Sequence, residues 1–252
     1  MRPRALVTGA GKRLGAHFAV GLAREGWDVA IHYAGSAEGA AATARAVEAA
    51  GGRAALFQAD LGSADAAAGL LPRVAEAFGA PTLLVNNASL FAYDTLETLT
   101  AEAWGAHLAV NLTAPVLLIQ AFARLLPEGE RGVVVNLLDQ KVAAPNPDYF
   151  SYTAGKVALA GMTRPLALAL APRIRLCGIA PGVTLPSGLQ TTDDFERASA
   201  ATPLGVTSSP DDLLATLLHI VRTPSLTGQI LTVDGGESLL HRERDVAYDS
   251  SV

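Results

Sequence analysis

Near its N-terminus the chain reads Thr8-Gly9-Ala10-Gly11-Lys12-Arg13-Leu14-Gly15, directly after the short apolar run Ala5-Leu6-Val7. Glycines let the backbone come close to a ligand, and the first N–H groups of a helix point toward a phosphate. A turn of this kind between a first strand and a first helix predicts a binding site for the pyrophosphate of a dinucleotide. Lys12 and Arg13 place positive charge where that pyrophosphate would lie.

Beyond this turn, short runs of Val, Leu and Ile alternate with Ala-rich stretches. Strands are predicted at 5–8, 28–32, 53–58, 83–86, 132–137, 173–179 and 229–233. Helices are predicted at 14–25, 37–50, 64–78, 100–126, 149–171 and 210–222. Several strands are continuously apolar, as a sheet covered on both faces requires. The pattern predicts one α/β domain over 1–252, a doubly wound Rossmann fold with a seven-stranded parallel sheet and helices on both faces.

Two segments depart from this alternation. Residues 182–209 are rich in Gly, Pro, Thr and Ser, which predicts a long loop that covers a substrate, with Leu185 or Leu189 in its lining. Residues 237–252 are mostly polar and charged. We expect this tail to be either mobile or docked on another subunit.

Composition limits the functional classes. The net charge is −5 with no basic run, so no nucleic acid is expected as a partner. The single cysteine, Cys177, lies in an apolar strand pattern and fits a reducing, cytoplasmic compartment. The strand-like run that begins just after the N-terminus leaves no room for a signal peptide, and no run of about 18 apolar residues predicts a membrane span. The five histidines do not pair at ligand spacing, so no metal is expected.

The end of the second predicted strand bears on the choice of cofactor. A site that prefers NAD usually has Asp or Glu there to accept the ribose hydroxyls. Here the chain reads Ile31-His32-Tyr33-Ala34-Gly35-Ser36, with no carboxylate to repel a 2′-phosphate. Ser36, His32 and the cations at 12 and 13 are candidates to hold that phosphate, which predicts NADPH. The alternative is that His32 and Tyr33 only end a strand.

A candidate catalytic group lies later in the chain. Tyr152 and Lys156 are one helical turn apart, and Asp139 precedes them. A cation roughly 5 Å away, at an effective dielectric near 20, contributes about 3 kcal/mol, which would lower the pKa of Tyr152 by roughly 2. This would bring the tyrosine toward the working range of an acid at neutral pH.

Asp139 bears on which double bond the site reduces. Ketone reduction builds negative charge on oxygen, which a hydroxyl donor stabilises and an ionised carboxylate opposes. Such a carboxylate would also raise the pKa of Tyr152 and offset Lys156. Reduction of a C=N bond adds a proton to nitrogen, and a nearby carboxylate favours the iminium character that precedes it. Asp139 therefore fits imine reduction better than carbonyl reduction, unless it is protonated and acts as a serine would.

These motifs together resemble the short-chain dehydrogenase/reductase superfamily over nearly the whole chain. The matching pieces are Thr8-Gly9 to Gly15, Asp60, Asn86-Asn87-Ala88, Asn111, Tyr152 with Lys156, Pro181-Gly182, and Asp234-Gly235-Gly236. Within the superfamily the chain looks like the pteridine reductases and the bacterial dihydrofolate or dihydromonapterin reductases. The pieces shared with that branch are residues 8–15, His32-Tyr33 with Ser36, Asn86-Asn87-Ala88-Ser89 with Phe91, and Asp139.

The resemblance implies residue roles. Asp60 would bind the adenine, Asn87 would lie near its ribose, and Lys156 would hold the nicotinamide ribose. Asn111 would hold a water in a proton relay, or else be a buried polar residue that bends its helix. Further cofactor contacts would come from Gly9, Leu14, Leu61, Ala88, Pro181 and Gly182. Phe91 would stack on the substrate, with the alternative of a core residue, and Ser89, Arg13 and Leu189 would also contact the substrate.

Three positions depart from these families. Arg13 takes a place that is commonly glycine in the superfamily, and Asp139 takes the place of its usual serine; both agree with the pteridine branch. Gly35 departs from that branch, where an arginine helps to clamp the 2′-phosphate.

The residues and the resemblance thus predict an NADPH-dependent reductase that transfers hydride to a C=N bond of a pterin or dihydrofolate, and the resemblance implies a homotetramer. One alternative is a ketone or oxoacyl reductase of the same superfamily. Another is a catalytically silent NADPH-binding scaffold.

Overall fold

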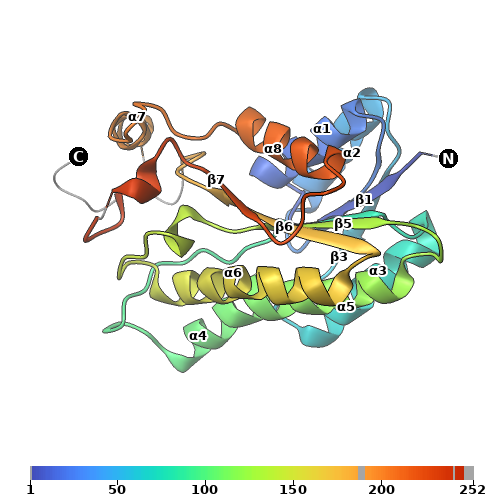
Figure 1. Cartoon of the computed structure of the whole chain (residues 1–252), viewed down its shortest axis with the longest axis horizontal. Helices are drawn as coiled ribbons and strands as arrows, with labels where there is room; N and C mark the ends of the chain where they lie inside the picture. Colours follow the sequence, from blue (N-terminus) through green and yellow to red (C-terminus); the bar gives the residue numbers. More distant parts are fainter. Residues whose placement is uncertain (1, 187–190, 241, 247–252) are drawn as a thin grey trace.

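The computed structural model describes residues 2–186, 191–240 and 242–246, and it contains one sheet of seven parallel strands (Figure 1). The strands are β1 (Arg4–Val7), β2 (Asp28–Tyr33), β3 (Ala54–Gln58), β4 (Leu83–Asn86), β5 (Gly132–Leu137), β6 (Ile174–Pro181) and β7 (Ile230–Val233). The main helices are α1 (Arg13–Arg24), α2 (Ala37–Ala49), α3 (Ala64–Phe78), α4 (Ala101–Leu108), α5 (Ala114–Leu125), α6 (Phe150–Leu170), α7 (Thr192–Ala200) and α8 (Pro210–Arg222). The predicted doubly wound fold is confirmed.

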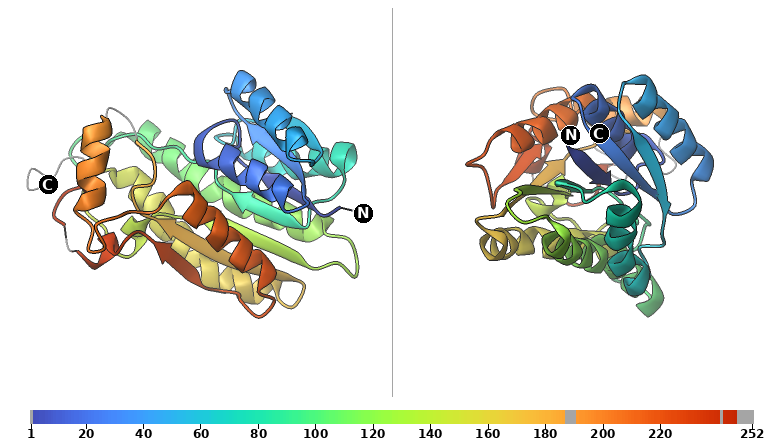
Figure 2. Two further views of the ribbon diagram at one scale, coloured as in Figure 1. Left: turned by 90° about the horizontal axis from the view of Figure 1, so that it is seen from above. Right: turned by 90° about the vertical axis from the view of Figure 1, so that its right-hand side faces the viewer.

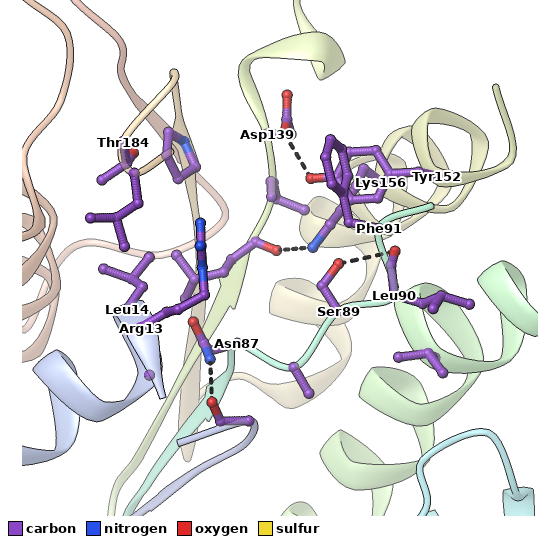
Figure 3. Close-up of a pocket in the computed structure, with 18 of the residues that line it drawn as sticks. Arg13, Leu14, Asn87, Ser89, Leu90, Phe91, Asp139, Tyr152, Lys156 and Thr184 are labelled. Carbon is purple, nitrogen blue, oxygen red and sulfur yellow. Dashed lines mark hydrogen bonds between the residues drawn. The ribbon is translucent and has the colours of Figure 1, made fainter. Parts of the chain in front are cut away.

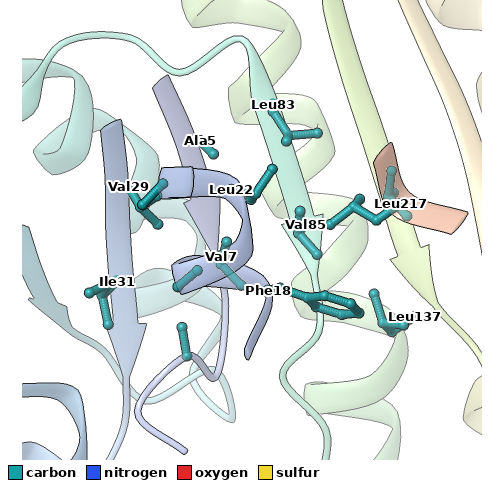
Figure 4. Close-up of a cluster of buried hydrophobic side chains, with 14 of the residues drawn as sticks. Ala5, Val7, Phe18, Leu22, Val29, Ile31, Leu83, Val85, Leu137 and Leu217 are labelled. Atoms are coloured by element: carbon teal, nitrogen blue, oxygen red, sulfur yellow. The ribbon is translucent and has the colours of Figure 1, made fainter. Parts of the chain in front are cut away.

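Helices cover both faces of the sheet (Figure 2). Helices α1, α2 and α8 pack on one face, and α3, α5 and α6 pack on the other. Each face has its own hydrophobic core. Figure 4 shows the first of these cores, in which Phe18 and Leu22 of α1 lie against Val7, Val85 and Leu137 of the strands. The central strands are therefore apolar on both sides, which accounts for their unbroken hydrophobic sequence.

The strand order is β3-β2-β1-β4-β5-β6-β7, so the chain reverses its direction of winding between β1 and β4. Ligands of such sheets bind in the crevice outside the carboxyl ends of the strands at this reversal. The glycine turn that follows β1 and the loop that follows β4 meet there. The side chain of Thr8 joins them, because its Oγ1 accepts hydrogen bonds from the N–H groups of Asn87 and Ala88, both at 2.9 Å.

Two predicted elements differ from the structure. The helix predicted at 100–126 is interrupted by a π-helical turn, η1 (Ala109–Thr113), which contains Asn111. Such turns inside α-helices occur frequently at functional sites. The loop predicted at 182–209 contains α7, whose sequence is polar and whose apolar residues are too sparse to indicate a helix.

The continuous helical stretch 101–125 is long and apolar enough, by length and composition alone, to cross a membrane. No membrane span is predicted from the sequence, because polar residues interrupt every apolar run in this region. A third of the most apolar window is buried, and the stretch packs against α3 and α6. It carries Asn111 toward the crevice, as a core helix of an α/β domain does.

Apolar side chains remain exposed along α6. Val157, Met162 and Leu168 are all at least one third exposed. An exposed apolar helix face suits packing against a second copy, and the homotetramer stays a prediction. Cys177 is buried in β6, as its apolar pattern predicts.

The glycine turn allows a matched test of packing. A Cβ added at Gly15 would lie 2.4 Å from the Gly9 carbonyl oxygen, whereas one added at Gly69 of α3 would meet nothing within 4 Å. Gly15→Ala should lower the free energy of unfolding by about 1–3 kcal/mol, since the turn must move. Gly69→Ala should raise it by about 0.5–1 kcal/mol, because alanine favours a helix. Urea denaturation measures the free energy of unfolding of both variants. An unchanged value for Gly15→Ala would contradict the close approach of Gly15 to the Gly9 carbonyl oxygen.

Candidate active site

A cleft of about 980 Å³ runs along the carboxyl ends of the strands (Figure 3). Its lining includes nearly every residue that the sequence predicts for cofactor or substrate: Gly9, Lys12, Arg13, Leu14, His32, Tyr33, Ser36, Asp60, Leu61, Asn87, Ala88, Ser89, Phe91, Asp139, Tyr152, Lys156, Pro181 and Gly182. Leu185 lines it as well, and Leu189 lies outside the described residues. The size is that of a small-molecule site.

The glycine turn is held rigidly against the end of β4. Gly9 has a φ of +65°, and a Cβ there would lie 2.9 Å from the Cα of Ala88. The side-chain amide of Asn87 donates to the Thr8 carbonyl oxygen at 2.8 Å. The loops after β1 and β4 thus form one surface, with room for a ligand directly against the backbone.

His32 supports this turn rather than a phosphate. Its Nδ1 accepts the Gly9 N–H at 3.0 Å, which leaves Nε2 to donate to the Ala59 carbonyl oxygen at 3.1 Å. Burial lowers the pKa of His32, and nearby Arg73 adds to this effect, while the bond to Ala59 opposes it. The expectation that His32 helps to hold a 2′-phosphate is therefore wrong, because a neutral ring with both nitrogens engaged offers no charge.

Two helices begin at the cleft without a side-chain cap. Lys12 precedes α1 and Ser36 precedes α2, and neither side chain caps its helix. The first N–H groups of α1 and the hydroxyl of Ser36 therefore remain available to an anionic ligand. The cleft-lining residues from the end of β2 to Ser36 include no carboxylate. These features fit a dinucleotide that carries a 2′-phosphate.

Arg13 occupies a strained backbone position. Its φ is +52°, in the left-handed region where a residue other than glycine costs roughly 1 kcal/mol. The glycine that the resemblance to the superfamily implies at this place would avoid this strain. The guanidinium reaches across the cleft and donates to the Pro186 carbonyl oxygen at 2.8 Å. Arg13 therefore joins the glycine turn to the segment after β6.

The predicted catalytic residues come together. Tyr152 donates its hydroxyl to Asp139 Oδ2 at 2.7 Å, and the backbone N–H of Lys141 donates to Asp139 Oδ1 at 2.9 Å. Lys156 Nζ donates to the Leu137 carbonyl oxygen at 2.7 Å and lies 5.6 Å from the centre of the Tyr152 ring. All three side chains point toward one part of the cleft in Figure 3.

The pKa of Tyr152 differs from the prediction. Burial, the charge of Asp139 and the hydrogen bond to its carboxylate raise it well above the usual value. Lys156 does not offset this, because its ammonium turns toward Leu137 and burial lowers its own pKa to about 8. Burial also raises the pKa of Asp139, although Lys141, Tyr152 and Lys156 oppose the rise. Tyr152 thus keeps its proton at neutral pH and shares it with a carboxyl that takes up protons more readily than usual.

Asn111 lies behind the cleft rather than in its lining. Its side-chain oxygen accepts from Ser89 Oγ at 2.9 Å and from the Leu90 N–H at 3.0 Å, while its nitrogen donates to the Leu90 carbonyl oxygen at 2.8 Å. Asn111 therefore positions the loop after β4. The role of holding a relay water stays a prediction.

Phe91 forms part of an aromatic group at the substrate end. Its ring stacks on Tyr149 at 4.1 Å and meets the edge of Tyr152 at 4.7 Å. The side chain is 41% exposed, so the alternative of a core residue is wrong. An exposed aromatic face beside the catalytic tyrosine suits a planar substrate.

The lining also contains polar residues that the sequence did not predict, among them Gln140, Lys141, Glu237 and Asp245. Gln140 and Lys141 directly follow Asp139, so their position offered a signal. Glu237 and Asp245 come from the predicted polar tail, whose described residues 237–240 and 242–246 dock on their own chain rather than on another subunit. About a hundred residues separate them from Asp139 in the sequence, and no local pattern indicates that they line the same cleft.

The general model of short chain dehydrogenases matches residues 3–197. The chain belongs to the short-chain dehydrogenase family. The order of its strands, the glycine turn and the Tyr152–Lys156 pair are the structural counterparts of this match.

The proteins to which this chain is similar carry different functional names. A crystal structure of FolM alternative dihydrofolate reductase 1 from Brucella canis, complexed with NADP, is 42% identical with a TM-score of 0.91, and the match covers 94% of each chain. The 3beta-hydroxysteroid dehydrogenase 1 of Eggerthella lenta is 34% identical over 93% of each chain. A 3-oxoacyl-[acyl-carrier-protein] reductase of Synechocystis sp. is 30% identical over 92% of this chain and 95% of its own.

Glu237 provides a pH-dependent test of this short-chain dehydrogenase. Burial and the charges of Asp139, Asp245 and Asp234 raise its pKa from 4.5 to about 7, against the opposing bond from the Val183 N–H. A raised pKa means that the folded chain binds more protons than the unfolded chain between these values, so stability is lost as pH rises through about 7. Glu237→Gln removes this loss.

Relative to wild type, the free energy of unfolding of Glu237→Gln should therefore increase by about 1–3 kcal/mol between about pH 4 and about pH 8. Urea denaturation at both pH values measures the difference. Glu48→Gln, on the exposed face of α2, is the control and should show no such trend. A difference from wild type that stays constant with pH would contradict a buried, titrating Glu237.

Proposed function

We propose that this short-chain dehydrogenase is an NADPH-dependent reductase that transfers hydride to a C=N bond of a dihydropterin or dihydrofolate. The observation that carries the proposal is the half-buried carboxyl of Asp139, which accepts the hydroxyl of Tyr152 at 2.7 Å. The similarity to a FolM alternative dihydrofolate reductase supports the same class of substrate.

The cleft suits NADPH as the hydride donor. The uncapped start of α1 and the close backbone at Gly9 provide for the pyrophosphate. Ser36, Lys12 and the missing carboxylate after β2 favour a 2′-phosphate. Lys156, one turn from Tyr152, is placed to hold the nicotinamide ribose. The similar structure from Brucella canis was crystallised with NADP.

The side chains of Asp139 and Tyr152 account for the proton that the reduced C=N bond takes up. When bound, the cofactor supplies hydride to the carbon of the C=N bond, and the nitrogen takes up one proton. The Asp139 carboxyl, with its raised pKa, holds that proton or draws on Tyr152 through their hydrogen bond. When it is ionised, its charge stabilises a positive nitrogen rather than a negative oxygen. Phe91 offers its ring face to a planar heterocycle.

Carbonyl reduction is the second candidate. The relatives named as a steroid dehydrogenase and an oxoacyl reductase favour it. The raised pKa of Asp139 allows a protonated carboxyl to donate to a carbonyl oxygen as a serine hydroxyl does. The two candidates therefore differ in the class of substrate that the same site would reduce.

Loss of cofactor absorbance with a panel of substrates tests the proposal. NADPH should be oxidised with dihydrobiopterin or dihydrofolate, much more slowly with ketones and oxoacyl thioesters, and more efficiently than NADH. Turnover of ketones alone would establish carbonyl reduction. Tight NADPH binding without oxidation by any substrate would favour the scaffold, and tighter binding of NADH would contradict the proposed cofactor.

A further inference from the structure

The last described residues, 242–246, lie against the loop 139–149 that joins β5 to α6. We call residues 242–246 the C-terminal strap. This loop begins with Asp139 and ends directly before the helix that carries Tyr152 and Lys156. At its other end the strap is tied to the segment after α7, because Arg242 Nη2 donates to the Ala201 carbonyl oxygen at 3.1 Å.

The strap neutralises a buried carboxylate of the loop. Asp148 is 1% exposed, and Arg244 donates to both of its oxygens, from Nε and from Nη2, at 2.8 Å each. The N–H of Asp245 and the hydroxyl of Tyr93 donate to the same carboxylate at 2.7 and 3.0 Å. Burial would raise the pKa of Asp148, but these donors outweigh it and hold the pKa below its usual value.

The strap also pairs with a buried cation of the loop. The side chain of Lys141 is 3% exposed, and its Nζ lies 2.8 Å from Asp245 Oδ2. The neutral oxygens of Asn146 and of the Asp148 backbone accept from the same ammonium at 2.6 and 3.4 Å. Arg244 and Asp245 therefore supply opposite charge to both buried charges of the loop. A buried charge that loses its partner is strongly unfavourable, so this conformation of the loop depends on the strap.

Two connections lead from this ion cluster to the reacting groups. The N–H of Lys141 donates to Asp139 Oδ1, so a fixed Lys141 fixes the carboxyl that Tyr152 contacts. Tyr93, bonded to Asp148, meets the edge of Tyr149 at 5.2 Å, and Tyr149 stacks on Phe91. Both the proton-carrying pair and the aromatic face thus rest on the same four charged side chains.

We propose that Arg244 and Asp245 are positioning residues: the strap holds the 139–149 loop through Asp148 and Lys141, and so sets the geometry of Asp139 and of the Phe91 stack. The measured turnover rests on the proposed function, whereas the mobility of the loop does not.

The test compares Arg244→Gln and Asp245→Asn with Glu243→Gln, a control whose exposed side chain belongs to the same strap. Hydrogen exchange is measured on peptides that cover 139–149 in the full chain without substrate, because amides of a loosened segment exchange faster. Peptides of β1 and β4 serve as the internal reference. Steady-state kinetics with the preferred substrate and the dissociation constant of NADPH complete the set.

Arg244→Gln and Asp245→Asn should both accelerate exchange in 139–149 and leave β1 and β4 protected. kcat should fall on the order of tenfold to a hundredfold, since a misplacement of about 1 Å can cost that much. The dissociation constant of NADPH should change less than about twofold, as the glycine turn lies elsewhere, and Glu243→Gln should match wild type throughout.

Unchanged hydrogen exchange in both variants would overturn the proposed role of the strap, even if kcat fell, because the conformation of the 139–149 loop would then not depend on the strap. Equal acceleration in β1 and β4 would also overturn it, since the variants would have loosened the whole domain. If the loop exchanges faster while wild type reduces no pterin or folate, the proposed function fails and the strap stands.

Discussion

The proposed chemistry of this short-chain dehydrogenase depends on one hydrogen bond, from the hydroxyl of Tyr152 to the half-buried carboxyl of Asp139. Burial raises the pKa of both Tyr152 and Asp139, so both groups favour their protonated forms. The hydrogen bond between them lets the pair share a proton. Lys156, directed at the Leu137 carbonyl oxygen, adds positive charge nearby without taking the hydroxyl from Asp139. Such a pair delivers a proton to nitrogen more naturally than it stabilises an oxyanion.

The fold brings this pair together from separate segments. Asp139 follows β5, Tyr152 lies in the first turns of α6, and Phe91 comes from the loop after β4. Buried polar contacts hold these segments in register: Asp94 accepts from the backbone and hydroxyl of Ser151 at the start of α6, and the ion cluster of the strap holds the loop between. Because the side chains of Asp94, Asp148 and Lys141 are buried, the loss of a partner of any of them would disturb more than its own residue.

Much of this arrangement could be predicted from the local sequence. The apolar runs predict the strands because both faces of the sheet are covered, and the glycine turn and Asp139 stand at strand ends, where the fold places ligands. Burial could not be read in advance, so the pKa of Tyr152 was predicted in the wrong direction, and the engagement of both His32 ring nitrogens in the turn was not foreseen. Glu237 and Asp245 join the cleft only through tertiary folding, which no local pattern encodes.

Replacement of Asp139 by serine tests the central claim most directly. In Asp139→Ser, reduction of dihydropterin should fall on the order of a hundredfold, because the proton-carrying carboxyl is lost, while ketone reduction should hold or rise, because a hydroxyl donor now faces the oxygen. Asp139→Asn, which keeps the shape without an acid, should lose pterin turnover as well. Undiminished reduction of dihydropterin by Asp139→Ser, with the thermal midpoint unchanged, would contradict the account.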